Sequence, residues 1–235
     1  WQTGNTSGQV NSSSINSYEF GIKGSLMFPR IFAPVFINRS YKYPAKTTFN
    51  LGASILNRPK FFTMLSANFS AVYDFQSSKN NYHSITPVQL TYTYLLRTTQ
   101  EFSDLMNGYT DENGNWVAGN EALRQSFDNQ FIPAISYTYT YDKRYGSKRE
   151  NRLIWQNTIT EAGNILSGIY SLAGSKGQKT MFGLHFSQFI KGVSEFRLYR
   201  QVGGVNMLAL RVMAGAGYAY GNSSVMPYSE QFFIG

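Results

Sequence analysis

The stretch FIPAISYTYTYD, from Phe131 to Asp142, alternates between two kinds of side chain. Its odd-numbered positions are apolar or aromatic: Phe131, Pro133, Ile135, Tyr137, Tyr139 and Tyr141. Its even-numbered positions are mostly small or polar: Ile132, Ala134, Ser136, Thr138, Thr140 and Asp142. A period of two residues places alternate side chains on opposite faces of a β-strand. The stretch therefore predicts a strand with one aromatic face and one small, polar face.

The same alternation recurs along the chain, and it predicts a series of strands. We expect them at Ser17 to Phe28, Thr47 to Leu56, Phe61 to Phe75, Tyr82 to Arg97, Asn129 to Tyr141, Glu150 to Glu161, Met181 to Gln201 and Val205 to Tyr220. Several exceed the usual five or six residues of a soluble strand. A strand that crosses a bilayer needs about 9 to 11 residues. Short and longer connections between the strands indicate an antiparallel meander.

The orientation of the two faces decides the class of protein. In a soluble sandwich, the polar face would meet water and the aromatic face a dry core. In an outer-membrane barrel the aromatic face meets lipid and the polar face lines a wet lumen. Strand length favours the barrel, as do the 17 tyrosines, which suit the girdles at the membrane interfaces. We expect an all-β fold, a transmembrane antiparallel β-barrel, with residues 1–235 forming part of one barrel domain.

Composition excludes several other classes. No run approaches the roughly 18 to 20 apolar residues of a spanning helix. The chain has no cysteine, so it has no disulfide framework. Its formal charge of +8 comes from lysines and arginines that are mostly spread singly along the chain, with the densest group at Asp142 to Arg149, so we expect no nucleic-acid partner.

Signals for chemistry are weak. The two histidines, His83 and His185, fall on different predicted strands, so we expect no metal site and no cofactor. DENGNW, from Asp111 to Trp116, imitates the start of a calcium loop, but Trp116 stands where such a loop requires glycine, so a solvated turn is the better interpretation. No Ser/His/Asp grouping stands out, and we expect no enzyme.

Three connecting segments carry helical spacing. They are TQEFSDLMNG, in which Gly108 would end the helix, NEALRQSF, and GNILSGIYSL. We expect small amphipathic helices that cap the barrel; contact with lipid or a partner is the alternative.

The last segment, LALRVMAGAGYAYGNSSVMPYSEQFFIG, resembles the BamA/TamA outer-membrane assembly superfamily, also called surface antigen barrels. In that family a strand with an arginine and glycines leads into a proline, an acidic residue, aromatics and a Gly-Gly pair. An Arg-Gly-aromatic motif then follows, on a loop that folds back into the lumen. The matching positions here are Pro227, Glu230, Phe232, Phe233 and Gly235, and the sequence ends before the Arg-Gly-aromatic motif.

Other segments resemble the Bacteroidetes, TamL-like branch of the family, among them SYEFGIKGSLMFPR, ITEAGNIL and HFSQFIKGVSEFRLYR. WQTGNTSG is similar to the family's first strand. The stretch from Gly8 to Ser17 is too short for the hairpin that should follow, so we expect a gap in the sequence near residues 8–17.

The resemblance implies a barrel of about sixteen strands, of which this chain supplies about eight or nine early and middle ones. Open strand edges are costly in lipid, so the remaining strands would come from another segment or chain. The implied function is assembly and insertion, or translocation, of outer-membrane proteins in the bacterial outer membrane. The implied partners are outer-membrane lipid, client proteins, and periplasmic or lipoprotein assembly partners.

The resemblance also gives the candidate binding residues. Pro227, Glu230, Phe232, Phe233 and Gly235 would form the root of the lumen loop. Lys191, Glu195, Arg197 and Arg211 would form the wall on which it packs, although ordinary charge pairing in the lumen explains these four equally well. Two rival functions stay open, a passive outer-membrane pore or uptake channel and a soluble carbohydrate-binding sandwich.

Overall fold

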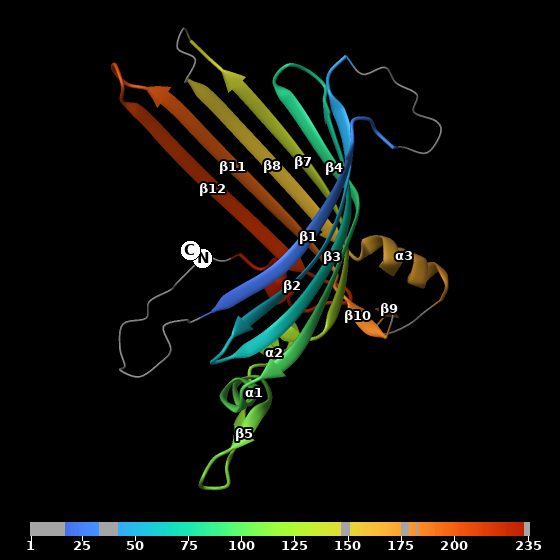
Figure 1. Cartoon of the computed structure of the whole chain (residues 1–235). Coiled ribbons are helices and arrows are strands. Elements are labelled where there is room, and N and C mark those ends of the chain that lie inside the picture. Colours follow the sequence, from blue (N-terminus) through green and yellow to red (C-terminus); the bar gives the residue numbers. More distant parts are fainter. Residues whose placement is uncertain (1–16, 33–41, 147–150, 175–178, 182, 233–235) are drawn as a thin grey trace.

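The computed structural model describes residues 17–32, 42–146, 151–174, 179–181 and 183–232. Its main feature is one large antiparallel sheet (Figure 1). The long strands are β1 (Tyr18–Phe28), β2 (Ala45–Arg58), β3 (Phe62–Gln76), β4 (Asn81–Thr98), β7 (Gln130–Arg144), β8 (Arg152–Ala162), β11 (Phe189–Gln201) and β12 (Met207–Ala219). They lie in the order of the chain, and β1 and β12 form the two edges.

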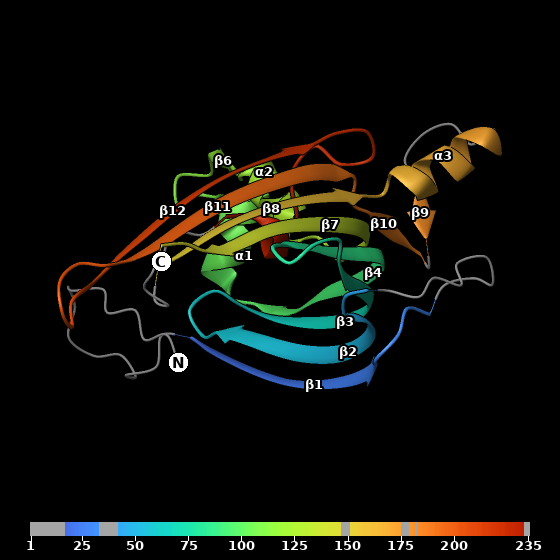
Figure 2. The same ribbon diagram turned by 90° about the horizontal axis from the view of Figure 1, so that it is seen from above.

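The sheet curves strongly, and it is open rather than closed into a barrel. Figure 2 shows the arc from above, with β1 and β12 at its two ends. Seven of the eight expected strands are therefore confirmed within one antiparallel meander, with ends that differ by a few residues, and the eighth, Met181 to Gln201, is confirmed only in its second part, β11. For example, Thr47 to Leu56 was expected, and β2 spans Ala45–Arg58.

The residues that follow β12 fold back inside the curve, and this tells which side chains face inward. Phe232 lies so close to Gly215 of β12 that a Cβ on this glycine would meet its ring. Odd-numbered residues of β12 therefore point to the concave face. Because paired residues share a face, the strand registers extend this assignment across the whole sheet.

The convex face is apolar and aromatic. It carries Phe20, Ile22, Leu51, Ile55, Phe69, Tyr73, Leu90, Tyr92, Tyr94, Phe131, Tyr137, Tyr139, Trp155, Ile159, Phe196, Leu210, Val212 and Tyr218. Many of these side chains are exposed, including Ile159, which is 57% exposed although β8 is an inner strand. A sandwich would need a second sheet on this face. Among the described residues the one other sheet is the small β5–β6 pair.

The concave face is mostly polar, and its side chains bond across strands. Ser25 donates to Asn50 at 2.7 Å, and the Asn50 amide donates to Ser70 at 3.1 Å, which links β1, β2 and β3. The hydroxyls of Thr138 and Thr158 lie 2.9 Å apart between β7 and β8. In these pairs, small polar side chains of neighbouring strands satisfy one another's hydrogen bonds.

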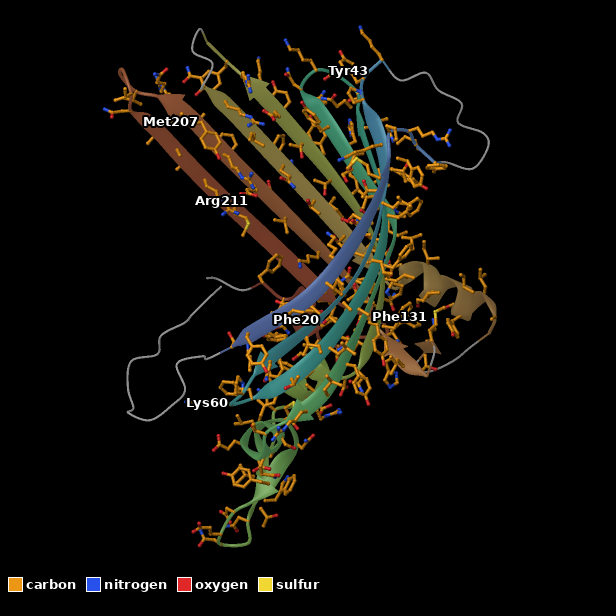
Figure 3. The ribbon with its side chains drawn as sticks, in the orientation of Figure 1. Phe20, Tyr43, Lys60, Phe131, Met207 and Arg211 are labelled. Carbon is orange, nitrogen blue, oxygen red and sulfur yellow. The ribbon has the colours of Figure 1, made fainter. Side chains whose placement is uncertain are left out.

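The two ends of the sheet differ in their connections. Figure 3 labels Lys60 at one end and Tyr43 and Met207 at the other. The Lys60 end carries the turn 59–61, the longer insertions 99–129 and 163–188, and the segment after β12. The opposite end carries the connections 29–44, 77–80, 145–151 and 202–206. Most of the inserted chain thus projects from the Lys60 end.

The insertion 99–129 contains two of the expected helices, α1 (Gln100–Asn107) and α2 (Glu121–Phe127). Thr99 and Asn120 cap them by accepting from the backbone N–H groups of Phe102 and Leu123, at 3.3 and 3.0 Å. A hairpin between them, β5 (Gly108–Thr110) and β6 (Trp116–Ala118), was not expected. The DENGNW stretch forms its turn, where the Asp111 carboxylate accepts from the N–H groups of Asn113 and Asn115.

The third expected helix, α3 (Asn164–Leu172), does not cap the concave face. It lies outside the curve of the sheet in both views (Figures 1 and 2). The prediction of one strand from Met181 to Gln201 was wrong. The chain forms β9 (Thr180–Met181) and β10 (Leu184–Phe186) before β11, and β10 pairs parallel with the start of β7. Gly183 breaks the strand with a φ of 77°.

The expectations for a first strand at Trp1 to Gly8 and for a gap near residues 8–17 fall almost wholly outside the described residues. Among the described residues, no helix is long and apolar enough to cross a membrane.

Candidate functional site

The chain after β12 crosses the concave face of the sheet; we call residues 220–232 the return segment. It begins with a turn at Gly221, whose φ is 63°, and includes a short 3-10 helix, η1 (Tyr228–Glu230). Pro227, just before η1, is fully buried. The segment is thus a packed part of the molecule.

A network of amide side chains fixes the first turn of the return segment. The Asn222 side-chain amide donates to the carbonyls of Lys179 and Phe186, at 2.9 and 2.8 Å, and its oxygen accepts from the Lys179 N–H at 2.8 Å. Gln188 Oε1 accepts from the Asn222 N–H at 3.0 Å, while Gln188 Nε2 donates to Asn164. The turn is therefore tied to Lys179 just before β9, to the last residue of β10 and, through Gln188, to the first residue of α3.

The middle of the return segment completes an apolar cluster at the Lys60 end. Tyr228 packs there beside Phe62 and Met64 of β3 and Phe127 of α2. Its ring stacks on Phe127, with the centroids 4.5 Å apart, and meets Phe62 edge-on at 5.6 Å. Burial raises the pKa of the Tyr228 phenol.

The end of the return segment is held by β11. The Lys191 ammonium donates to the backbone carbonyl of Glu230 at 2.8 Å and lies 3.4 Å from its carboxylate. The same ammonium lies 5.0 Å from the centroid of the Phe232 ring, within the range of a cation–π contact. One lysine thus contacts two of the residues predicted for the loop root.

Two glycines of β12 allow the return segment to lie close to the sheet. A Cβ on Gly215 would lie 2.7 Å from Cε1 of Phe232, and one on Gly217 would lie 2.5 Å from the sulfur of Met226. A larger residue at Gly215 would displace the Phe232 ring, and one at Gly217 would displace the Met226 side chain. Gly215 and Gly217 therefore mark a close approach of the return segment to β12, as glycines within strands often do.

The other three residues predicted for the wall form a separate cluster. Glu195 receives two hydrogen bonds from Arg197, both at 2.7 Å, and a further one from Arg211 of β12. Arg197 and Arg211 stand directly opposite each other, so Glu195 offsets the repulsion of two like charges. Among the described residues, no hydrogen bond or ion pair links this cluster to the return segment.

Of the predicted site residues, the structure brings Lys191 together with Glu230 and Phe232. It places Pro227 in the same segment, while Phe233 and Gly235 lie outside the described residues. Tyr228 and Asn222 were not predicted. Tyr228 stands within the quoted stretch, but neither residue follows a periodic pattern that would predict its contacts.

The site has no features of a metal centre. Among the described residues, no group of three or more His, Cys, Asp or Glu could hold a metal ion.

No protein-family model and no curated protein matches the chain. The arrangement does define a class of structure: a curved sheet with an apolar outer face, a polar inner face and a segment packed against the inner face.

Proposed function

We propose that this sheet is part of a transmembrane β-barrel in a bacterial outer membrane and that the barrel acts in the assembly or translocation of outer-membrane proteins. The observation that carries the proposal is the apolar convex face. Exposed apolar side chains follow one another across this whole face, among them Leu51 and Ile159, which are 67% and 57% exposed, and soluble proteins rarely expose so continuous an apolar surface. Lipid would cover these side chains, and the polar concave face would line a wet lumen.

The order of residues along the convex face supports this orientation. Near the Lys60 end stand aromatic residues such as Tyr18, Tyr92 and Tyr218, and near the other end stand Tyr139, Tyr141 and Phe75. Between them lie aliphatic residues, including Ile22, Leu90 and Ala214. Two aromatic bands around an aliphatic one are typical of outer-membrane barrels. The longer insertions at the Lys60 end would then face the outside of the cell.

The return segment supports an assembly role over a passive pore. It runs from β12 to β3 across the concave face, where an open channel would need free space. Its path also fits the resemblance to the BamA/TamA superfamily, in which a loop folds back into the lumen. The barrel would open between its first and last strands and offer an edge to a client strand, whose backbone groups would pair as they enter lipid.

The membrane part of the proposal is tested by adding a charge to either face of β8. We expect Ile159→Lys, on the convex face, to lower the free energy of unfolding from lipid, and so the stability, by about 2–4 kcal/mol. Gln156→Lys is the matched control, because Gln156 stands on the concave face opposite Glu195. Urea titration in liposomes measures both. An equal, small effect of the two substitutions would refute a lipid-facing convex side.

The assembly part is tested with the whole protein in proteoliposomes and an unfolded outer-membrane barrel as client. We expect the client to fold faster than in empty liposomes, measured by its heat-modifiable mobility on gels. Efflux of a small solute without faster folding would instead support the passive pore.

A further inference from the structure

We infer that α3 lies in the interfacial layer of the membrane, with its apolar stripe against lipid at the boundary of headgroups and acyl chains. This inference rests on the proposed membrane location of the sheet. It adds to it a membrane contact that is made by a helix rather than by the strands.

The composition of α3 supports this location. The helix has no charged residue from Asn164 to Leu172. Ile165, Ile169 and Leu172 follow each other at spacings of four and three residues, so they form one stripe along the helix. They are 58%, 56% and 91% exposed, and no residue of the helix is buried.

The contacts that hold α3 lie away from this stripe. The Tyr170 hydroxyl donates to the carbonyl of Thr180 at 2.6 Å, and the Tyr170 ring stacks on Phe186 at 6.0 Å. On the serine side, the Lys179 ammonium donates to the carbonyl of Ser167 and the hydroxyl of Ser171, at 2.9 and 2.8 Å. The polar and aromatic sides are thus used within the protein, and the stripe is left for another partner.

The position of α3 identifies that partner as the membrane. The helix follows Gly163, whose N–H donates to the carbonyl of Pro133 at 2.8 Å. Two residues earlier on β7, Phe131 pairs with Tyr92, in the aromatic band of the convex face. The helix leaves the wall at the level of this band and on the convex side (Figure 1), where the membrane interface would lie.

The length of α3 gives a physical reason for the contact. Isolated helices shorter than about 12 to 15 residues are marginal in water. This nine-residue helix, with no buried residue of its own, gains little from packing. Interfacial lipid would bury the stripe and leave the serines and Lys179 near the headgroups, as amphipathic surface helices do.

The absence of cysteine from the sequence allows a direct test. Nitroxide labels on Ile169→Cys, Ser171→Cys and Ile159→Cys would be compared in the whole protein, reconstituted in phosphatidylcholine–phosphatidylglycerol vesicles. Electron paramagnetic resonance measures collisions with oxygen, which favours lipid, and with a nickel chelate, which favours water. We expect a several-fold higher oxygen-to-nickel ratio at position 169 than at position 171, which points away from the stripe. Leu172→Cys serves as the second stripe position if the first variant does not fold.

The three labels separate the two proposals. A water-like value at 169, or at 172 where it replaces 169, together with a lipid-like value at 159 would overturn the inference and leave the membrane barrel in place. Water-like values at all positions would overturn both. A label at 169 that neither reagent reaches would show a protein contact, such as a second copy, and would also overturn the inference.

Discussion

The ring of Tyr228 stacks on the ring of Phe127, with centroids 4.5 Å apart and planes inclined by 26°. Tyr228 belongs to the return segment and Phe127 to α2, so this pair joins the chain after β12 to the insertion that precedes β7. The contact holds the return segment against β3 and α2, across the concave face from β12, the strand that precedes the segment.

We expect Tyr228→Ala to lower the free energy of unfolding by about 2 to 3 kcal/mol, less than a fully buried ring would lose, because Tyr228 is only partly buried. Tyr228→Phe keeps the ring and serves as the control. Urea titration in detergent micelles measures both. Equal losses for the two variants would show that the hydroxyl, rather than the stacked ring, stabilises the segment.

Lys191 and Glu230 should respond unequally to substitution. Lys191→Met leaves the Glu230 carboxylate, which is 17% exposed, without its cation. We expect this substitution to lower the free energy of unfolding by about 1–3 kcal/mol. Glu230→Gln should cost less, because the shorter bond from Lys191 goes to the backbone carbonyl of residue 230. Unfolding midpoints measure the difference. A loss with Glu230→Gln as large as with Lys191→Met would contradict this account of the contact.

Gly215 and Gly192 provide a matched test of the close approach at β12. A Cβ at Gly215 would lie 2.7 Å from the Phe232 ring, whereas one at Gly192 would meet nothing within 4 Å. We expect Gly215→Val to displace Phe232 and to speed chymotrypsin cleavage after it, measured by mass spectrometry. Gly192→Val should leave the cleavage rate unchanged. Unaltered cleavage in Gly215→Val would mean that the segment does not depend on this glycine.

The pH dependence of α2 follows from Glu121. Hydrogen bonds from Arg124 and Gln125 lower the pKa of its carboxyl from 4.5 to about 2. A lowered pKa in the folded state means that this stabilisation is complete above about pH 4.5 and is lost as the pH falls toward 2. Carboxyl chemical shifts from NMR should give a midpoint near 2, and Arg124→Met should move it toward 4.5. A midpoint near 4.5 in the unchanged protein would rule out the contact in solution.

The sequence predicted the strands well because each long strand keeps its period of two over many residues. On β7, Tyr137 and Thr138 stand on the convex and concave faces as their alternation indicated. The registers place the apolar side chains of neighbouring strands on the same face. This consistency was visible in the periodicity alone, whereas a curved sheet that this chain does not close was expected only through the family resemblance.

The errors occurred where contacts distant in sequence override the local pattern. Leu184 and Phe186 continue the alternation of β11, but β10 pairs with β7 and Gly183 separates it from β9.

Lys191 and Glu230 were predicted through a family resemblance, since their separation in sequence carries no periodic signal. Asn222 bonds to the backbone carbonyls of Lys179 and Phe186, and no spacing in the sequence indicates such partners.

The parallel strand β10 occupies the edge of β7 just beyond the end of β8, where Ser187 donates its N–H to the carbonyl of Phe131 and its hydroxyl to Gln130. Because β10 occupies this edge of β7, β8 cannot shift along β7 toward the Lys60 end without displacing β10. The offset between β7 and β8 is therefore held by β10 as well as by their own hydrogen bonds. If the sheet opens, we expect the movement at strands other than the β7–β8 pair.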